Sequence, residues 1–138
     1  MAFWIVKSEP EEYSFDRLRE EKRTLWTGIR NFTARNNLRA MKSGELVLFF
    51  HTGKEKAAVG IAKVASEAQP DPTGPKGEDW AAVELAPVKP LAEPVPLATL
   101  KANAKTKTIS VVRMGRLSVG ALTPSEWSAV LKLSNTKA

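Results

Sequence analysis

Glu45-Leu46-Val47-Leu48-Phe49-Phe50-His51 places five apolar residues in a row between two polar ends. A strand with one wet face would alternate apolar and polar side chains, because successive side chains point to opposite faces of the sheet. This stretch is apolar on both faces, which is typical of a strand buried inside a barrel or sandwich. We therefore expect a β-rich fold with residues 45–51 at its centre.

Shorter β-forming runs and helix signals alternate on both sides of this strand. The other expected strands are residues 3–8, 57–65, 80–85, 108–113 and 116–119. Short helices are expected after Ser14, over residues 31–42 and 97–102, and after Thr123. Four prolines between Pro87 and Pro96 predict extended connectors there. The fold class is α+β: a small, closed or nearly closed mixed barrel of five or six strands, flanked by short helices.

Length and composition restrict the possible classes of protein. With 138 residues, 43% of them hydrophobic, the chain fits one domain over residues 1–138. It has no cysteine, which excludes disulfides and thiolate chemistry. No apolar run approaches the roughly 20 residues of a spanning helix, and no leader pattern opens the chain. We expect a cytoplasmic monomer with no membrane association and no cofactor.

The segment from Trp26 to Asn36 carries residue types that suit nucleic acid. Six basic and no acidic residues lie between Lys22 and Gly44, in a chain of net charge +6. Indole rings stack on bases, and Asn amides can hydrogen-bond to base edges. The alternative interpretation is structural, with Trp26 in the core and Asn31 capping a helix.

Residues 31–42 have helical spacing and two distinct faces. Ala34, Leu38 and Met41 form an apolar stripe at i, i+4 and i+7. Arg35, Arg39 and Lys42 form a basic stripe that could follow a phosphate backbone, to which we add Arg30 and Arg116. The alternative is an ordinary solvated charged face.

Catalytic and metal-binding patterns are not recognisable. His51 is the only histidine, without a nucleophile–acid set or a second metal ligand, so a structural or pocket-lining role is expected. The acidic group at Glu9, Glu11 and Glu12 has no partner pattern for acid–base work. We predict no catalytic residue and no metal ligand.

Several motifs together resemble the EVE domain family. They are Trp4–Pro10, Trp26–Asn31, Ala34-Arg35-Asn36, Gly44–His51, Pro70–Thr73 and Gly115–Val119, in the order found in that family. The resemblance covers nearly the whole chain. It implies a PUA-like barrel flanked by helices, related to YTH readers of methylated RNA, and binding of nucleic acid with modified bases in a pocket beside the barrel.

By this resemblance, the pocket would be lined by residues from the end of the first strand and from the Trp26 turn. They are Lys7, Ser8, Glu9, Trp26, Thr27 and Asn31, and we add His51 as a pocket-lining candidate. The loop over residues 67–80 departs from the family pattern, because its segment 74–79 has no aromatic residue to form a second wall.

The sequence therefore predicts a non-enzymatic module that reads modified, methylated bases in DNA or RNA. Two other classes stay open. An enzyme acting on modified RNA or nucleotides would turn over modified nucleosides, and a protein-interaction module would bind its partner with little dependence on salt.

Overall fold

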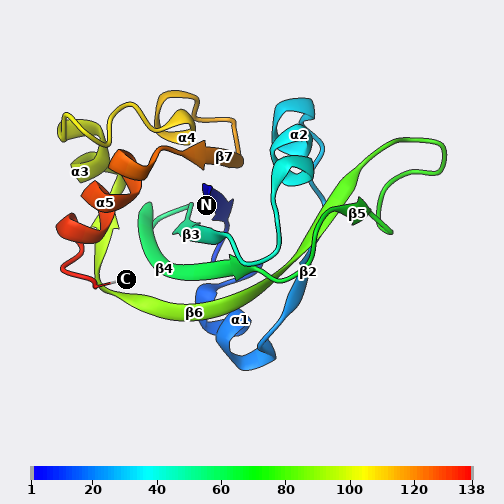
Figure 1. Ribbon diagram of the computed structural model, residues 1–138, viewed down its shortest axis with the longest axis horizontal. Helices are drawn as coiled ribbons and strands as arrows, with labels where there is room; N and C mark the ends of the chain where they lie inside the picture. The colour runs from blue at the N-terminus through cyan, green and yellow to red at the C-terminus, as the bar shows by residue number, and fades with distance from the viewer. Residues whose placement is uncertain (1, 138) are drawn as a thin grey trace.

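The computed structural model describes residues 2–137, which form a strongly curved mixed sheet with short helices around it (Figure 1). The strands found in this range are β1 Phe3–Ser8, β2 Thr24–Trp26, β3 Leu46–His51, β4 Ala57–Val64, β5 Gln69–Pro70, β6 Ala81–Pro96 and β7 Val119–Leu122. The helices are α1 Phe15–Glu21, α2 Phe32–Ala40, α3 Leu97–Ala102, α4 Ser110–Arg113 and α5 Pro124–Leu133.

The strand order is β2-β6-β4-β3-β1-β7, with β5 paired to β6 beside this path. β1 runs parallel to β3, and the other pairings are antiparallel. β3 lies between β1 and β4, and all of it except Leu46 is buried, as its apolar pattern predicted. The mixed, barrel-like sheet with short flanking helices is confirmed.

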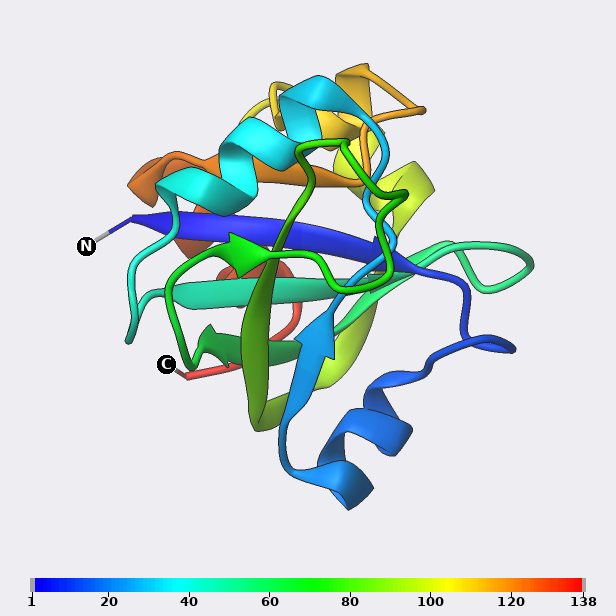
Figure 2. The ribbon, with the colours of Figure 1, turned by 90° about the vertical axis from the view of Figure 1, so that its right-hand side faces the viewer.

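The barrel is open, contrary to the prediction of closure or near closure. Within residues 2–137 the outer strands β2 and β7 do not pair with each other, so the curled sheet is a half-barrel. Helix α2 lies against β7 and β6 on this open side (Figure 2). The Asn37 side chain donates a hydrogen bond to the Val119 carbonyl of β7 at 2.8 Å. A helix therefore covers an edge that a strand would cover in a closed barrel.

The core lies inside the curl of the sheet. Trp4, Phe49, Val83 and Trp127 are buried as predicted, whereas Val59 is only partly buried. Gly60 of β4 faces the ring of Phe15 from α1, which belongs to the same buried cluster. A Cβ at position 60 would overlap that ring, so the missing side chain leaves room for Phe15 beside β4.

The expected strand over residues 108–113 is wrong. This segment is the short helix α4, closed by hydrogen bonds from Arg113 N to Ile109 O at 3.0 Å and from Met114 N to Ser110 O at 2.8 Å. Ile109 and Val111 are buried in this conformation, and β-propensity yields to such packing. The strand expected at residues 116–119 begins only at Val119 and ends at Leu122.

The expected connectors between Pro87 and Pro96 are also wrong, because β6 continues through them to Pro96. Its register with β4 is interrupted here: Gly60 is opposite Pro90, but Ala58 is already opposite Val95. Such irregularities tolerate proline, which cannot donate to the ladder.

The helix starts agree with the sequence. Ser14, Asn31 and Thr123 each cap a helix by accepting a hydrogen bond at 3.0 Å from a backbone N–H three residues later. Thr123 and Glu126 form the expected capping box of α5, with Pro124 at its first position. Helices α3, α4 and α5 gather at one end of the sheet, and α2 and β5 lie toward the other (Figure 1).

Candidate nucleic-acid interface

A cleft of about 380 Å³ lies beside β2, at the end of β1. Its lining comes from β1 and the turn after it, from β2 and its turn, and from the segment before β7. These residues are Lys7, Ser8, Glu9, Glu12, Tyr13, Thr24, Leu25, Trp26, Thr27, Gly28, Ile29 and Ser118. We call it the Trp26 cleft. Its volume falls within the range of about 300–1,000 Å³ that is common for small-ligand sites.

Trp26 belongs to the core and to the cleft wall at once. Only 8% of the residue is exposed, and its ring meets Tyr13 and Phe49 edge-on, at centroid distances of 5.7 Å and 5.4 Å. The indole N–H has no acceptor among the described residues. None of their fully buried side-chain polar atoms lacks a hydrogen-bond partner, so this N–H is not fully buried. It is therefore a hydrogen-bond donor that a ligand in the cleft could use.

The end of β1 contributes polar groups that the fold holds in place. The Ser8 hydroxyl donates to the Tyr13 carbonyl at 2.5 Å, which leaves its oxygen as an acceptor. The Lys7 ammonium donates to the carbonyls of Val111 and Gly115, at 3.0 Å and 3.1 Å. Burial lowers the pKa of Lys7, and the nearby Lys101 ammonium lowers it further.

Asp71 fixes the turn that carries Trp26. Its side chain is fully buried and accepts hydrogen bonds from Gly28 N at 2.9 Å, Arg30 Nη1 at 3.0 Å, and Thr73 N and Oγ1 at 2.7 Å each. Burial by itself would raise the pKa of Asp71, but the hydrogen bonds from Thr73, Gly28 and Arg30 lower it to about 2. The turn from Trp26 to Arg30 is thus held by a carboxylate that is ionised at neutral pH.

Two residues proposed for the pocket lie outside the Trp26 cleft. Asn31 is exposed, and its Oδ1 is occupied by the N–H of Ala34 at the start of α2. His51 is buried: its Nε2 accepts from Phe15 N at 3.0 Å, and its Nδ1 lies 3.0 Å from Glu55 Oε2. Both side chains serve the fold, so a direct contact of either with a base in this cleft is not supported. Lys7, Ser8, Glu9, Trp26 and Thr27 do come together there.

The basic residues proposed to contact the nucleic-acid backbone differ in whether protein groups already bind them. Arg30 pairs with Asp71, and Arg39 with Asp79. Arg35 donates to the Asp79 carbonyl at 3.1 Å. Lys42 and Arg116 are exposed and form no ion pair within residues 2–137. The arginines of α2 and its turn therefore bind the 71–79 loop, which the sequence did not reveal because these partners are some 40 positions away.

The 67–80 loop does not line the Trp26 cleft. It ends in Trp80, whose ring stacks on Phe32 with centroids 5.3 Å apart and planes 13° apart. Phe32 is 65% exposed. The loop thus gives no second wall to the cleft, but it supports the Trp26 turn through Asp71.

Sequence reasoning missed several lining residues, among them Tyr13, Thr24 and Ser118. A signal existed for Thr24, because residues two apart in a strand share a face, and Thr24 is two positions before Trp26 in β2. Ser118 comes from a distant segment, and nothing in the sequence places it near β1.

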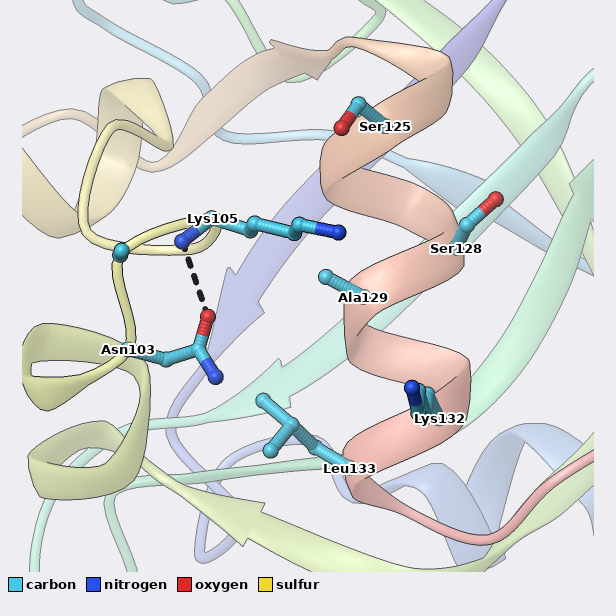
Figure 3. Close-up of a pocket in the computed structure, with 8 residues that line it drawn as sticks. Asn103, Lys105, Ser125, Ser128, Ala129, Lys132 and Leu133 are labelled. Atoms are coloured by element: carbon cyan, nitrogen blue, oxygen red, sulfur yellow. Dashed lines mark hydrogen bonds between the residues drawn. The ribbon is translucent and has the colours of Figure 1, made fainter.

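A larger cleft of about 700 Å³ lies between α5 and the turn after α3. Figure 3 shows Lys105 and Asn103 from the turn opposite Ser125, Ala129 and Lys132 of α5, with Lys105 N donating to Asn103 Oδ1 at 2.9 Å. No aromatic ring lines this cleft. A base would find nothing to stack on, so we place the candidate site in the smaller Trp26 cleft.

Nowhere in residues 2–137 do three His, Cys, Asp or Glu side chains cluster as metal ligands would.

Comparison with known proteins now identifies the family. The EVE domain family matches the chain over residues 2–133. The chain belongs to the EVE domain family.

Solved relatives share the whole EVE fold. A crystal structure of an Agrobacterium tumefaciens protein is 36% identical with a TM-score of 0.94, covering 99% of this chain and 94% of the other. Human thymocyte nuclear protein 1, solved in complex with DNA containing 5-methylcytosine, is 30% identical with a TM-score of 0.90, covering 100% of both chains.

The YTH domain of Zygosaccharomyces rouxii MRB1, solved in complex with N6-methyladenosine RNA, is a more distant neighbour of this EVE domain. It is 16% identical with a TM-score of 0.57, covering 96% of this chain and 86% of the other. This likeness shows a common fold, and it confirms the PUA-like architecture that the resemblance implied. No helix in residues 2–137 has the length and apolar character to span a bilayer.

Proposed function

We propose that this EVE domain is a non-enzymatic reader of methylated bases in nucleic acid and that the base enters the Trp26 cleft. The observation that carries the proposal is the cleft itself, which Trp26 lines together with Ser8, Thr27 and Ser118. A flat apolar wall with a few hydrogen-bonding groups is what a single extruded base requires. The human relative was solved with DNA containing 5-methylcytosine, which supports the same ligand class here.

A methyl group would raise affinity through apolar contact in such a cleft. Burying one methyl is worth about 0.8 kcal/mol, or roughly a fourfold preference over the unmodified base. Hydrogen bonds to Ser8, Ser118 or the Trp26 N–H would fix the orientation of the base and thus choose which methylated base fits. The preference is therefore modest per methyl group and depends on the shape of the cleft.

Fluorescence anisotropy with matched oligonucleotides tests the proposal. Single strands with one central cytosine, 5-methylcytosine, adenine or N6-methyladenine, as DNA and as RNA, are titrated at one fixed salt concentration. We expect one methylated base to bind at least about threefold more tightly than its unmethylated partner. Equal affinity for every modified and unmodified pair would refute the reader function. Turnover of a modified nucleoside would instead favour the enzyme alternative.

The indole is tested with Trp26→Phe rather than Trp26→Ala. Truncation to alanine in this packed position costs about 3–5 kcal/mol of stability and confuses binding with unfolding. Phenylalanine keeps most of the contact with Tyr13 and Phe49 but loses the N–H and part of the ring. We expect weaker binding of the methylated strand, by roughly 5-fold or more, with the fold retained.

The matched control is Trp127→Phe, the same chemical change in the core, where Trp127 stacks on Phe3 outside the cleft. It should melt at a lower temperature than the parent and bind as the parent does. If both variants lost affinity equally, the effect would come from stability and not from the cleft.

A further inference from the structure

A second, smaller cavity of about 170 Å³ adjoins the Trp26 cleft. Its walls come from β1, the β3–β4 turn, α3, and the segment around α4. The lining residues are Lys7, Phe50, Thr52, Gly53, Lys56, Leu97, Lys101, Val111, Val112 and Gly115. Three of them are lysines and none is acidic, so we call it the lysine cavity.

The lysine cavity shares a wall with the Trp26 cleft. Lys7 lines both spaces, and its ammonium is held by the carbonyls of Val111 and Gly115, which belong to residues of the lysine cavity. Gly53 is a second junction: a Cβ built there would lie 2.5 Å from Glu9 Oε2, and Glu9 lines the cleft. A ligand that fills the cleft therefore passes next to the lysine cavity.

The cations here are available, unlike Arg30 and Arg39. Lys56 and Lys101 are exposed and take part in no ion pair within residues 2–137. Residues 101–138 contain seven basic residues and one acid, Glu126. That acid is buried and accepts from Thr123 N and from the Thr108 hydroxyl, at 2.8 Å and 2.7 Å.

The backbone keeps these lysines near one another. Lys56 has φ of 44°, a left-handed conformation that residues other than glycine rarely adopt. Leu97 N donates to the Lys56 carbonyl at 2.7 Å and ties it to the start of α3, which carries Lys101. Strained positions of this kind persist only where the surrounding structure enforces them, and they gather at functional sites.

We propose that the lysine cavity binds a backbone phosphate of the strand whose base occupies the Trp26 cleft. The inference rests on the proposed function for its ligand, and it adds a direction: the strand leaves the cleft toward α3 and α4, not along α2. Two ammonium groups and the remaining donor of Lys7 suit a phosphate, to which lysine binds as a point charge. The nearest carboxylates are that of Glu9, which lies against Gly53 at the junction of the two spaces, and that of Glu55, which is hydrogen-bonded to His51.

The test removes the two exposed charges and keeps a long polar side chain at each position, in the double variant Lys56→Gln, Lys101→Gln. Binding of the single-stranded oligonucleotides is measured across salt concentrations. Losing one phosphate contact should lower the salt slope by about 0.7 and the affinity roughly 3- to 10-fold at low salt. Methylated and unmethylated strands should lose affinity equally, because the phosphate carries no base information.

Two controls have the same chemistry elsewhere. Lys63→Gln removes an exposed lysine of β4 that lines neither space, and it should leave the salt slope unchanged. Lys101→Arg keeps the charge and should bind like the parent. Melting of each variant shows that the fold is retained.

Inorganic phosphate separates this inference from the reader function. Titrated into the protein alone and followed by NMR, it should shift the amides of Gly53 and Gly115, and the shifts should vanish in the double variant. An unchanged salt slope in the double variant, or no phosphate-induced shift at these amides in the parent, overturns the inference. If the parent shows both effects but no preference for any methylated base, the lysine cavity stands and the reader function fails.

Discussion

At the scale of single residues, Asp71 has a structural role that the sequence did not reveal, because its side chain holds the turn that carries Trp26. It satisfies Gly28, Arg30 and Thr73 at once, across more than 40 positions of chain for the first two. A carboxylate in this position has its charged form stabilised by hydrogen bonds, and its pKa of about 2 reports that stabilisation.

The pKa of Asp71 predicts a specific loss of stability in acid. Because the folded pKa lies below the ordinary value of 3.8, the native state binds the proton less tightly than the unfolded chain. The carboxylate therefore stabilises the fold above about pH 4, and this contribution of about 2 kcal/mol is lost as the pH falls toward 2.

Urea unfolding at pH 6 and at pH 2.5 measures this loss in the parent and in Asp71→Asn. The variant should be about 2–3 kcal/mol less stable than the parent at pH 6 and should differ much less at pH 2.5. Thr99→Ala, a substitution in α3 away from this loop, serves as the control. An equal gap between the parent and Asp71→Asn at both pH values would contradict the assignment.

Site residues that lie within short sequence motifs could be predicted, whereas those brought in from distant segments could not. The resemblance indicated five residues of the Trp26 cleft because they sit in two short motifs. It also indicated Asn31, whose side chain is occupied by Ala34 N in the structure. Ser118 could not be found from sequence, since a cleft between distant segments exists only after the sheet has curled.

At the scale of elements, the helix starts were predictable because a cap is a contact between residues three apart. Two of the errors concern which segments form strands. β6 runs through its prolines because β4 provides an irregular partner, and residues 108–113 form α4 because Ile109 and Val111 pack inward. The local sequence shows neither the pairing with β4 nor the inward packing of Ile109 and Val111. Local propensity therefore favoured a connector in the first case and a strand in the second.

The cap of α2 gives a prediction that separates its structural role from base recognition. Asn31→Ala removes the acceptor for Ala34 N and should cost about 1 kcal/mol, or a melting temperature lower by about 3–5 °C. Affinity for the methylated strand should not change, because Asn31 does not line the cleft. Asn31→Ser, which can also cap, should recover most of the stability. If Asn31→Ser had normal stability but still bound the methylated strand weakly, Asn31 would have to contact the ligand.

At the scale of the whole molecule, the half-barrel explains how a small chain offers two adjacent sites. The curled sheet leaves β2 and β7 unpaired with each other. The end of β2 and the turn after it carry Trp26 and Thr27 to the cleft, and the segment before β7 carries Ser118. The α3–α4 segment then brings Lys101 beside Lys7. Openness of the sheet is thus what makes room for a ligand.

The same architecture predicts that residues 1–138 unfold as one cooperative unit. The buried cluster takes residues from β1 through α5 and includes Trp4, Trp26 and Trp127. A single core of this size melts in one all-or-none transition. Trp80 lies outside this cluster, at the end of the 67–80 loop, where it stacks on Phe32 of α2. Its fluorescence could therefore report a change confined to that loop.

Thermal melts followed by tryptophan fluorescence and by far-UV circular dichroism test this cooperativity. In a Trp80→Phe variant only the three core tryptophans remain, and both probes should give the same midpoint and the same van't Hoff enthalpy. Any earlier fluorescence change seen in the parent but not in Trp80→Phe would be assigned to the loop, not to the core. Two separated transitions in the Trp80→Phe variant would mean that β1–β4 and the α3–α5 end of the molecule unfold independently. The lysine cavity and the Trp26 cleft both take residues from the two parts, so both would then be disrupted in the first transition.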